Sequence, residues 1–156
     1  TVSGIPSSVE AAIELFQHDP LQFQHWFVER IGGFPTQKKG ADKGIDGKLY
    51  FETSDGLQEM VLSVKGGVIR PTDVRDLRGV LEREDNASMA GFLSLKPPTR
   101  AMLDEAARAG VFQYQRVKYD RIQFLTVKDV IEDKKYFKTP SRIGVKGETN
   151  QAILAV

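Results

Sequence analysis

The fold is decided by residues 40–67, which read GADKGIDGKLYFETSDGLQEMVLSVKGG. Asp55-Gly56 lies between two runs that favour β-structure, and an Asp-Gly pair in that setting is a strong signal for a β-hairpin. We therefore expect a first strand that opens on Asp46 and a second strand that ends in Ser63-Val64-Lys65. Side chains alternate along a strand, so Ser63 and Lys65 share one face of the sheet and Val64 lies on the other.

The predicted hairpin brings groups suited to phosphate chemistry to one end of the sheet. Asp46 opens the first strand, and Lys65 lies two residues beyond the polar Ser63 at the end of the second. These two ends are neighbours in an antiparallel pair, so the carboxylate and the ammonium can converge. That arrangement is suited to holding a divalent metal ion beside a phosphodiester.

The composition is that of an ordinary soluble domain. The 156 residues are 40% hydrophobic and 28% charged, which suffices for one domain with a sizeable core. There are no cysteines, which excludes disulfides and thiolate metal sites and fits a cytoplasmic protein. No apolar run approaches membrane-spanning length and no signal peptide is visible, so no membrane partner is expected. Because the chain opens on Thr1, we expect a piece of a longer protein.

The charge is distributed unevenly although the net charge is only +1. Residues 1–60 carry five Lys and Arg against nine Asp and Glu, and residues 61–156 carry 17 against 12. An acidic site beside a basic half is consistent with metal ligands that face a phosphate-binding surface. Random scatter of surface charge explains the same split nearly as well.

Helical and strand patterns alternate along the rest of the chain. The predicted helices are 9–16, a second one to about Ile31, one after Pro71, one from 97 to 109 and one from 127 to 132; the predicted strands outside the hairpin are 34–37, 89–95, 111–114 and 122–126. This order predicts an α/β domain whose mixed central sheet has helices on both faces. We expect the domain to span residues 1–133, with 134–156 as a C-terminal tail or linker.

The motif GADKGIDG followed by SVKGG resembles the Mrr-like branch of the PD-(D/E)XK nuclease superfamily. The sequence RDLRGVLERE strengthens the resemblance, which extends from about Asp19 to about Asp133. It is closest to the nuclease-like segments attached to bacterial site-specific DNA methyltransferases of restriction–modification systems. The resemblance implies a restriction-endonuclease-like core and Mg²⁺ (or Mn²⁺) as the cofactor.

The resemblance also implies a set of site residues. Asp46, Glu29 from the first helical region and the backbone carbonyl of Val64 would hold the metal. Lys65 would orient the attacking water or stabilise the developing charge, with Ser63 as the remaining member of the catalytic set. Ser63 departs from the family pattern, in which a glutamate, aspartate or glutamine usually stands at this position.

The serine removes one negative charge from the usual metal cage. A hydroxyl is neutral and short, so it ligates weakly or through a water. Three consequences remain open: Glu29 or Glu52 restores the charge, the metal affinity is low, or the domain no longer cuts DNA.

Four basic residues are candidates for contacts with DNA phosphates. Lys38 and Lys39 precede the glycine-rich approach to the hairpin, where a solvated turn is an equally good interpretation. Arg75 and Arg78 lie on the exposed side of the helix after Pro71, where ion pairing with acidic residues of the same helix competes. His25, one turn before Glu29, is better explained as a surface or helix-packing residue.

These observations support a first hypothesis, a Mg²⁺-dependent endonuclease that cleaves double-stranded DNA. The alternative is an inactive module of the same fold that binds DNA or docks a methyltransferase domain of the same parent chain. A junction- or flap-specific repair nuclease is a third, weaker interpretation. A homodimer would supply two active sites for cutting both strands. The sequence contains no nucleotide-binding loop, zinc helix, nucleophile elbow or methyltransferase tetrapeptide.

Overall fold

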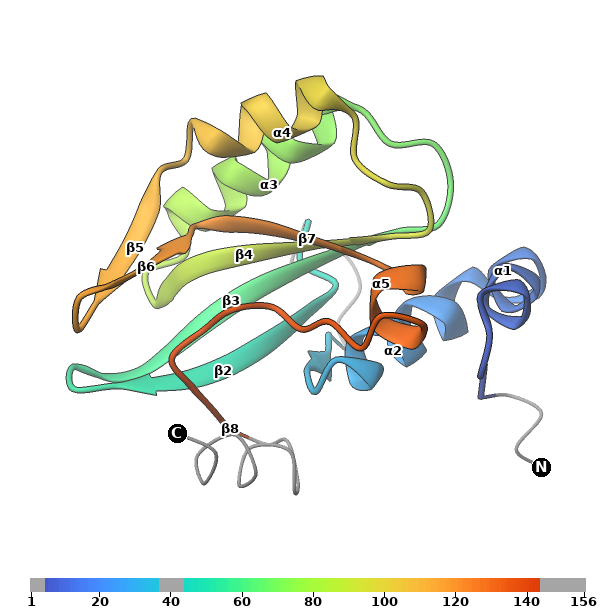
Figure 1. Cartoon of the computed structure of the whole chain (residues 1–156), viewed down its shortest axis with the longest axis horizontal. Helices are drawn as coiled ribbons and strands as arrows, with labels where there is room; N and C mark the ends of the chain where they lie inside the picture. Colours follow the sequence, from blue (N-terminus) through green and yellow to red (C-terminus); the bar gives the residue numbers. More distant parts are fainter. Residues whose placement is uncertain (1–4, 37–43, 144–156) are drawn as a thin grey trace.

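A computed structural model of the chain describes residues 5–36 and 44–143 (Figure 1). The helices are α1 (Val9–His18), α2 (Pro20–Arg30), α3 (Pro71–Arg83), α4 (Arg100–Ala107) and α5 (Val127–Ile131). The strands are β1 (Phe34–Pro35), β2 (Gly47–Thr53), β3 (Gly56–Lys65), β4 (Ala87–Ser94), β5 (Val111–Tyr114), β6 (Val117–Asp120), β7 (Ile122–Thr126) and β8 (Ser141–Ile143). None of the helices in these ranges is long and apolar enough to cross a membrane.

The central sheet is mixed, as the sequence predicts. Its strands run in the order β1-β2-β3-β4-β7, and β8 also pairs with β2. The β1, β3 and β8 pairings with β2 are antiparallel, whereas β3–β4 and β4–β7 are parallel. A separate hairpin is formed by β5 and β6. The α/β class with a mixed sheet is therefore confirmed.

Helices cover both faces of the sheet (Figure 1). On one face, α1, α2 and α5 pack over Leu62, Val64 and the apolar residues of β2. On the other, α3 and α4 pack over Val61 and Phe92. The two faces of β3 thus bury alternate residues, which confirms that Val64 points away from the face shared by Ser63 and Lys65.

The β2–β3 hairpin forms at the predicted turn. Thr53 pairs with Gly56, whose φ of 111° lies in a region that favours glycine. The first strand begins at Gly47, one residue later than expected. The backbone N–H of Asp46 still donates to β3, to the carbonyl of Leu62 at 2.8 Å, although Leu62 is the register partner of Gly47.

The segment after Asp133 belongs in part to the folded unit. Phe137 is 4% exposed, and it lies beneath Gly91 of β4, where an added Cβ would come within 2.5 Å of its ring. Strand β8 then pairs with β2 through Tyr50. The folded unit therefore extends to Ile143, rather than ending at Asp133, because this segment contributes a core side chain and a strand.

Candidate active site

The carboxylate of Asp46 lies where β2 begins and β3 is about to end. Its Oδ2 accepts a hydrogen bond of 2.8 Å from the backbone N–H of Val64, and its Oδ1 accepts one of 3.0 Å from Nε2 of Gln24. The side chain therefore occupies the position at which β2 would otherwise continue to pair with β3. One strand and one helix orient both carboxylate oxygens.

The backbone carbonyl of Val64 points toward the same opening. Successive backbone groups of a strand point to opposite edges. Leu62 accepts from the N–H of Asp46, on the β2 side, and Lys65 accepts from the N–H of Leu95 at 3.3 Å, on the β4 side. Val64 lies two residues after Leu62 and so directs its carbonyl toward Asp46. Its use as a metal ligand stays a prediction.

Gln24 reaches Asp46 because α2 approaches the sheet very closely at Gly47. A Cβ at Gly47 would lie 2.6 Å from Cγ1 of Val28, so a glycine is required at this contact. Gln24 lies four residues before Val28 and hence on the same side of the helix. It is therefore directed at the residue beside Gly47, which is Asp46. Neither the motif nor the resemblance had pointed to Gln24.

Burial alters the ionisation of Asp46. Desolvation raises the pKa of this carboxyl above its ordinary value of 3.8, while the hydrogen bond from Val64 and the positive charge of Lys65 oppose the rise. Lys65 is half-buried, and it makes no direct ion pair with Asp46. The positive charge of Lys65 therefore influences Asp46 without a direct ion pair.

Two other predicted members show no contact with Asp46. Ser63 is 6% exposed, and its hydroxyl has no hydrogen-bond partner among the described residues. Glu29 is exposed, and its carboxylate likewise has no partner in the described part of the chain. Glu29 lies five positions after Gln24, so its side chain projects roughly 140° away from that of Gln24 around the helix axis. Its part in a metal site stays a prediction, as does that of Ser63.

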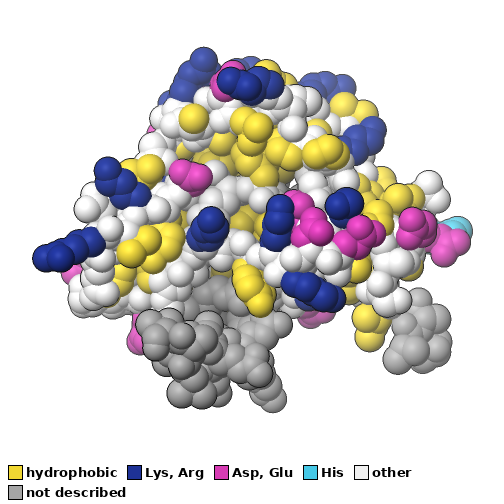
Figure 2. All heavy atoms as spheres, in the orientation of Figure 1, with side chains coloured by type: hydrophobic (Ala, Val, Ile, Leu, Met, Phe, Trp, Pro, Cys, Tyr) yellow, Lys and Arg dark blue, Asp and Glu magenta, His cyan; other side chains and the backbone are white. Residues whose placement is uncertain are grey.

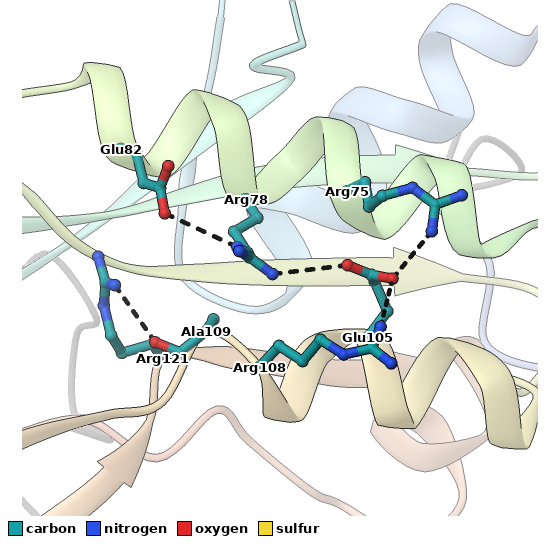
Figure 3. Close-up of polar contacts among 7 residues, drawn as sticks. All are labelled: Arg75, Arg78, Glu82, Glu105, Arg108, Ala109 and Arg121. Carbon is teal, nitrogen blue, oxygen red and sulfur yellow. Dashed lines mark hydrogen bonds and ion pairs between the residues drawn. The ribbon is translucent and has the colours of Figure 1, made fainter.

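Of the four predicted DNA contacts, Lys38 and Lys39 lie outside the described residues. Arg75 and Arg78 pair with the buried carboxylate of Glu105 at 2.9 and 3.5 Å, and Arg108 pairs with it at 3.0 Å (Figure 3). The pairing expected within α3 is also present, since Arg78 lies 3.7 Å from Glu82. A DNA phosphate would have to compete with these carboxylates.

The donors at Asp46 suit a hard cation, although their charge is low. No group of three or more His, Cys, Asp or Glu side chains gathers anywhere in the described residues. Asp46 supplies one carboxylate, and the Val64 carbonyl is the neutral oxygen that the strand geometry directs toward it. Mg²⁺ prefers such oxygen ligands and commonly keeps several waters, so the set fits this ion, and we expect weak binding.

We expect Gln24→Glu to strengthen binding of a divalent ion at least about tenfold. The substitution sets a second carboxylate about 3 Å from Asp46. Without metal, the two like charges should lower the free energy of unfolding by about 1–2 kcal/mol at neutral pH. Calorimetric titration with Mn²⁺ and thermal unfolding with and without EDTA measure the two effects. Gln22→Glu, which adds the same charge at an exposed position of α2, is the control and should change neither; equal ion affinity in both variants would contradict the expectation.

Comparison of the sequence with protein-family models and with curated proteins found no match.

Proposed function

We propose that this chain is a restriction-endonuclease-like domain that hydrolyses phosphodiester bonds of double-stranded DNA with Mg²⁺ or Mn²⁺. The observation that carries the proposal is the fixed carboxylate of Asp46. It is bonded to the Val64 N–H at the point where β2 and β3 part, and it lies within the electrostatic reach of Lys65. The motif GxDxGID…SVK places these groups on neighbouring strands. A parent chain that also carries a DNA methyltransferase domain accords with the resemblance of the motif.

Each group has a distinct part in the proposed reaction. Asp46 would hold the cation through an oxygen oriented by Gln24 and Val64, with the Val64 carbonyl as a second protein ligand. A bound divalent ion supplies Lewis acidity toward the phosphate and a lower pKa for the attacking water. Lys65 orients that water and stabilises the negative charge that develops on the phosphate.

A second function, DNA binding without cleavage, is favoured by two specific observations. Ser63 stands where a second carboxylate is usual, and the helix offers Asp46 an amide, Gln24, instead of an acid. Asp46 also retains internal hydrogen-bond partners for both of its oxygens. Such a module would use the same surface to hold DNA or to dock a methyltransferase domain.

Cleavage of plasmid DNA with Mg²⁺ or Mn²⁺ tests the first proposal. We expect Lys65→Ala to slow cutting about 100-fold, because the attacking water loses the group that orients it and the phosphate loses the ammonium that stabilises its developing charge. Lys118→Ala removes an exposed lysine on β6, far along the chain from the site, and should leave the rate unchanged. Equal cutting by wild type and Lys65→Ala would overturn the assignment of Lys65.

A filter-binding or anisotropy measurement with the same DNA separates the two functions. Salt-sensitive binding without cleavage by any divalent ion would support the binding module. Metal-dependent cleavage that requires Lys65 would support the nuclease.

A further inference from the structure

The central sheet has an open edge at β7. Hydrogen bonds to β4 use alternate residues of β7, and the N–H of Ala90 donates to the carbonyl of Arg121 at 2.7 Å. In this parallel register Gln123 and Leu125 face β4, whereas the backbone groups of Ile122 and Phe124 point outward. No strand of the described residues pairs with that edge. An exposed row of N–H and C=O groups is a template for pairing with another chain.

The open edge forms the floor of a groove of about 870 Å³. One wall is α4, the other is the segment 135–138, and the β5–β6 hairpin closes one end. Three of its lining residues, Leu103, Val111 and Tyr136, are large hydrophobic side chains that are 46–58% exposed. Hydrophobic side chains gather beneath α4 on this side of the molecule, with basic side chains around them (Figure 2). The groove thus combines an unpaired strand with uncovered apolar surface.

The wall at 135–138 is held in place without covering the strand. The side-chain amide of Gln123 donates to the carbonyl of Lys138 at 2.8 Å and accepts from its N–H at 2.7 Å. Phe137, buried beneath Gly91, anchors the same segment. A side chain, rather than a strand, therefore connects this segment to β7. No described residue bonds to the outward backbone groups of Ile122 and Phe124, although Ile122 itself is only 4% exposed.

The charges of the groove select for an acidic partner. Three lysines (118, 135 and 138) and one acid (Asp120) are its charged lining residues, a net charge of +2. Lys118 and Lys138 make no ion pair with any described residue, and Lys135 lies 3.7 Å from Asp129. Two copies of this chain joined edge to edge at β7 would bring two such basic rims together. Electrostatics therefore disfavours a second copy as the occupant.

We propose that this groove binds an extended peptide of alternating apolar and acidic residues, which adds to the sheet as a strand beside β7. Its backbone would pair with the outward groups of Ile122 and Phe124. Side chains of an added strand alternate in direction. One set would meet the apolar α4 wall at Leu103, and the other would meet the lysines around Lys138.

Titration of the isotope-labelled 156-residue chain with a blocked peptide of alternating valine and glutamate, roughly eight residues long, tests the proposal. We expect saturable changes in the amide signals of β7, of α4 and of residues 135–138, with protection of the Phe124 amide from exchange. A matched peptide with lysine for glutamate should bind about five- to tenfold more weakly. The glutamate peptide N-methylated at alternate residues should not bind.

The double variant Lys118→Glu/Lys138→Glu provides a charge-swap control, because both side chains are exposed and make no ion pair with a described residue. It should prefer the lysine peptide, with unchanged thermal stability. Several outcomes would overturn the proposal: no signal change at millimolar peptide, equal binding of both peptides, or unaltered preference in the double variant. Changes in the same signals with protein concentration alone would identify a second copy as the occupant instead.

Discussion

Asparagine in place of Asp46 is expected to reduce metal-dependent DNA cleavage by about 1000-fold or more while raising the stability of the metal-free protein at neutral pH. The amide cannot supply the anionic ligand that would hold the metal ion. Stabilisation of the transition state by a metal Lewis acid is worth several kcal/mol. Asparagine keeps the size of the side chain and its acceptor for the Val64 N–H. It removes a charge whose burial raises the pKa of the carboxyl.

The direction of the pH effect follows from the raised pKa. Folded Asp46 binds its proton more tightly than it does in the unfolded chain, where the pKa is about 3.8. The carboxyl therefore favours the folded state most below that value, and this contribution falls as the pH rises through the raised pKa. The stability of wild type relative to Asp46→Asn should decline over that interval and level off above it.

The difference in stability between wild type and Asp46→Asn can be measured by thermal unfolding in EDTA between about pH 4 and about pH 7. Added Mg²⁺ or Mn²⁺ should raise the melting temperature of wild type and leave that of Asp46→Asn unchanged. Asp55→Asn, in the exposed β2–β3 turn, is the matched control and should behave as wild type in cleavage and stability. The nuclease proposal fails if Asp46→Asn cleaves plasmid at the wild-type rate.

The hairpin and the layers of the fold could be predicted from the sequence because they depend on long, regular patterns. The Asp55-Gly56 turn and the alternation along β3 fix the register locally. Strands β6 and β8, which the sequence does not predict, lack such patterns. The turn before β6 uses Gln115 and Arg116 at φ values of 50° and 71°, so no glycine marks it. Strand β8 has three residues and depends on a distant partner, β2.

The candidate site was predictable only where it lies on the hairpin. Asp46, Val64 and Lys65 are brought together by local register, and the structure places them at one end of β3. The helical partner depends on how α2 rotates over the sheet, which the contact between Val28 and Gly47 decides. That contact directs Gln24 at Asp46, whereas the part of Glu29, which the resemblance implies, stays a prediction. The sequence does not show which helix residue packs on Gly47, so the position of Gln24 could not be predicted from it.

Replacing Glu105 is expected to have the largest effect on stability. Its carboxylate is 5% exposed, and it is surrounded by Arg75, Arg78 and Arg108, which come from both α3 and α4 (Figure 3). Removing it leaves three positive charges near one another with no common acceptor. Breaking a buried ion pair costs about 3–5 kcal/mol. The arginines are 33–65% exposed, so solvent screening reduces the expected cost to roughly 2–3 kcal/mol.

Glu105→Gln tests this expectation most sharply, because glutamine keeps the shape of the side chain and an oxygen acceptor but loses the charge. Urea unfolding should show the free energy of unfolding reduced by roughly 2–3 kcal/mol, with an unchanged dependence on denaturant. Asp104→Asn removes the same charge from the neighbouring position, where the ion pair with Arg100 joins side chains that are 60% and 88% exposed. This control should lose less than about 0.5 kcal/mol. Equal stabilities of the two variants would mean that solvent screening, rather than Glu105, limits the repulsion among the three arginines. They would then be as free to contact a phosphate as the sequence alone suggested.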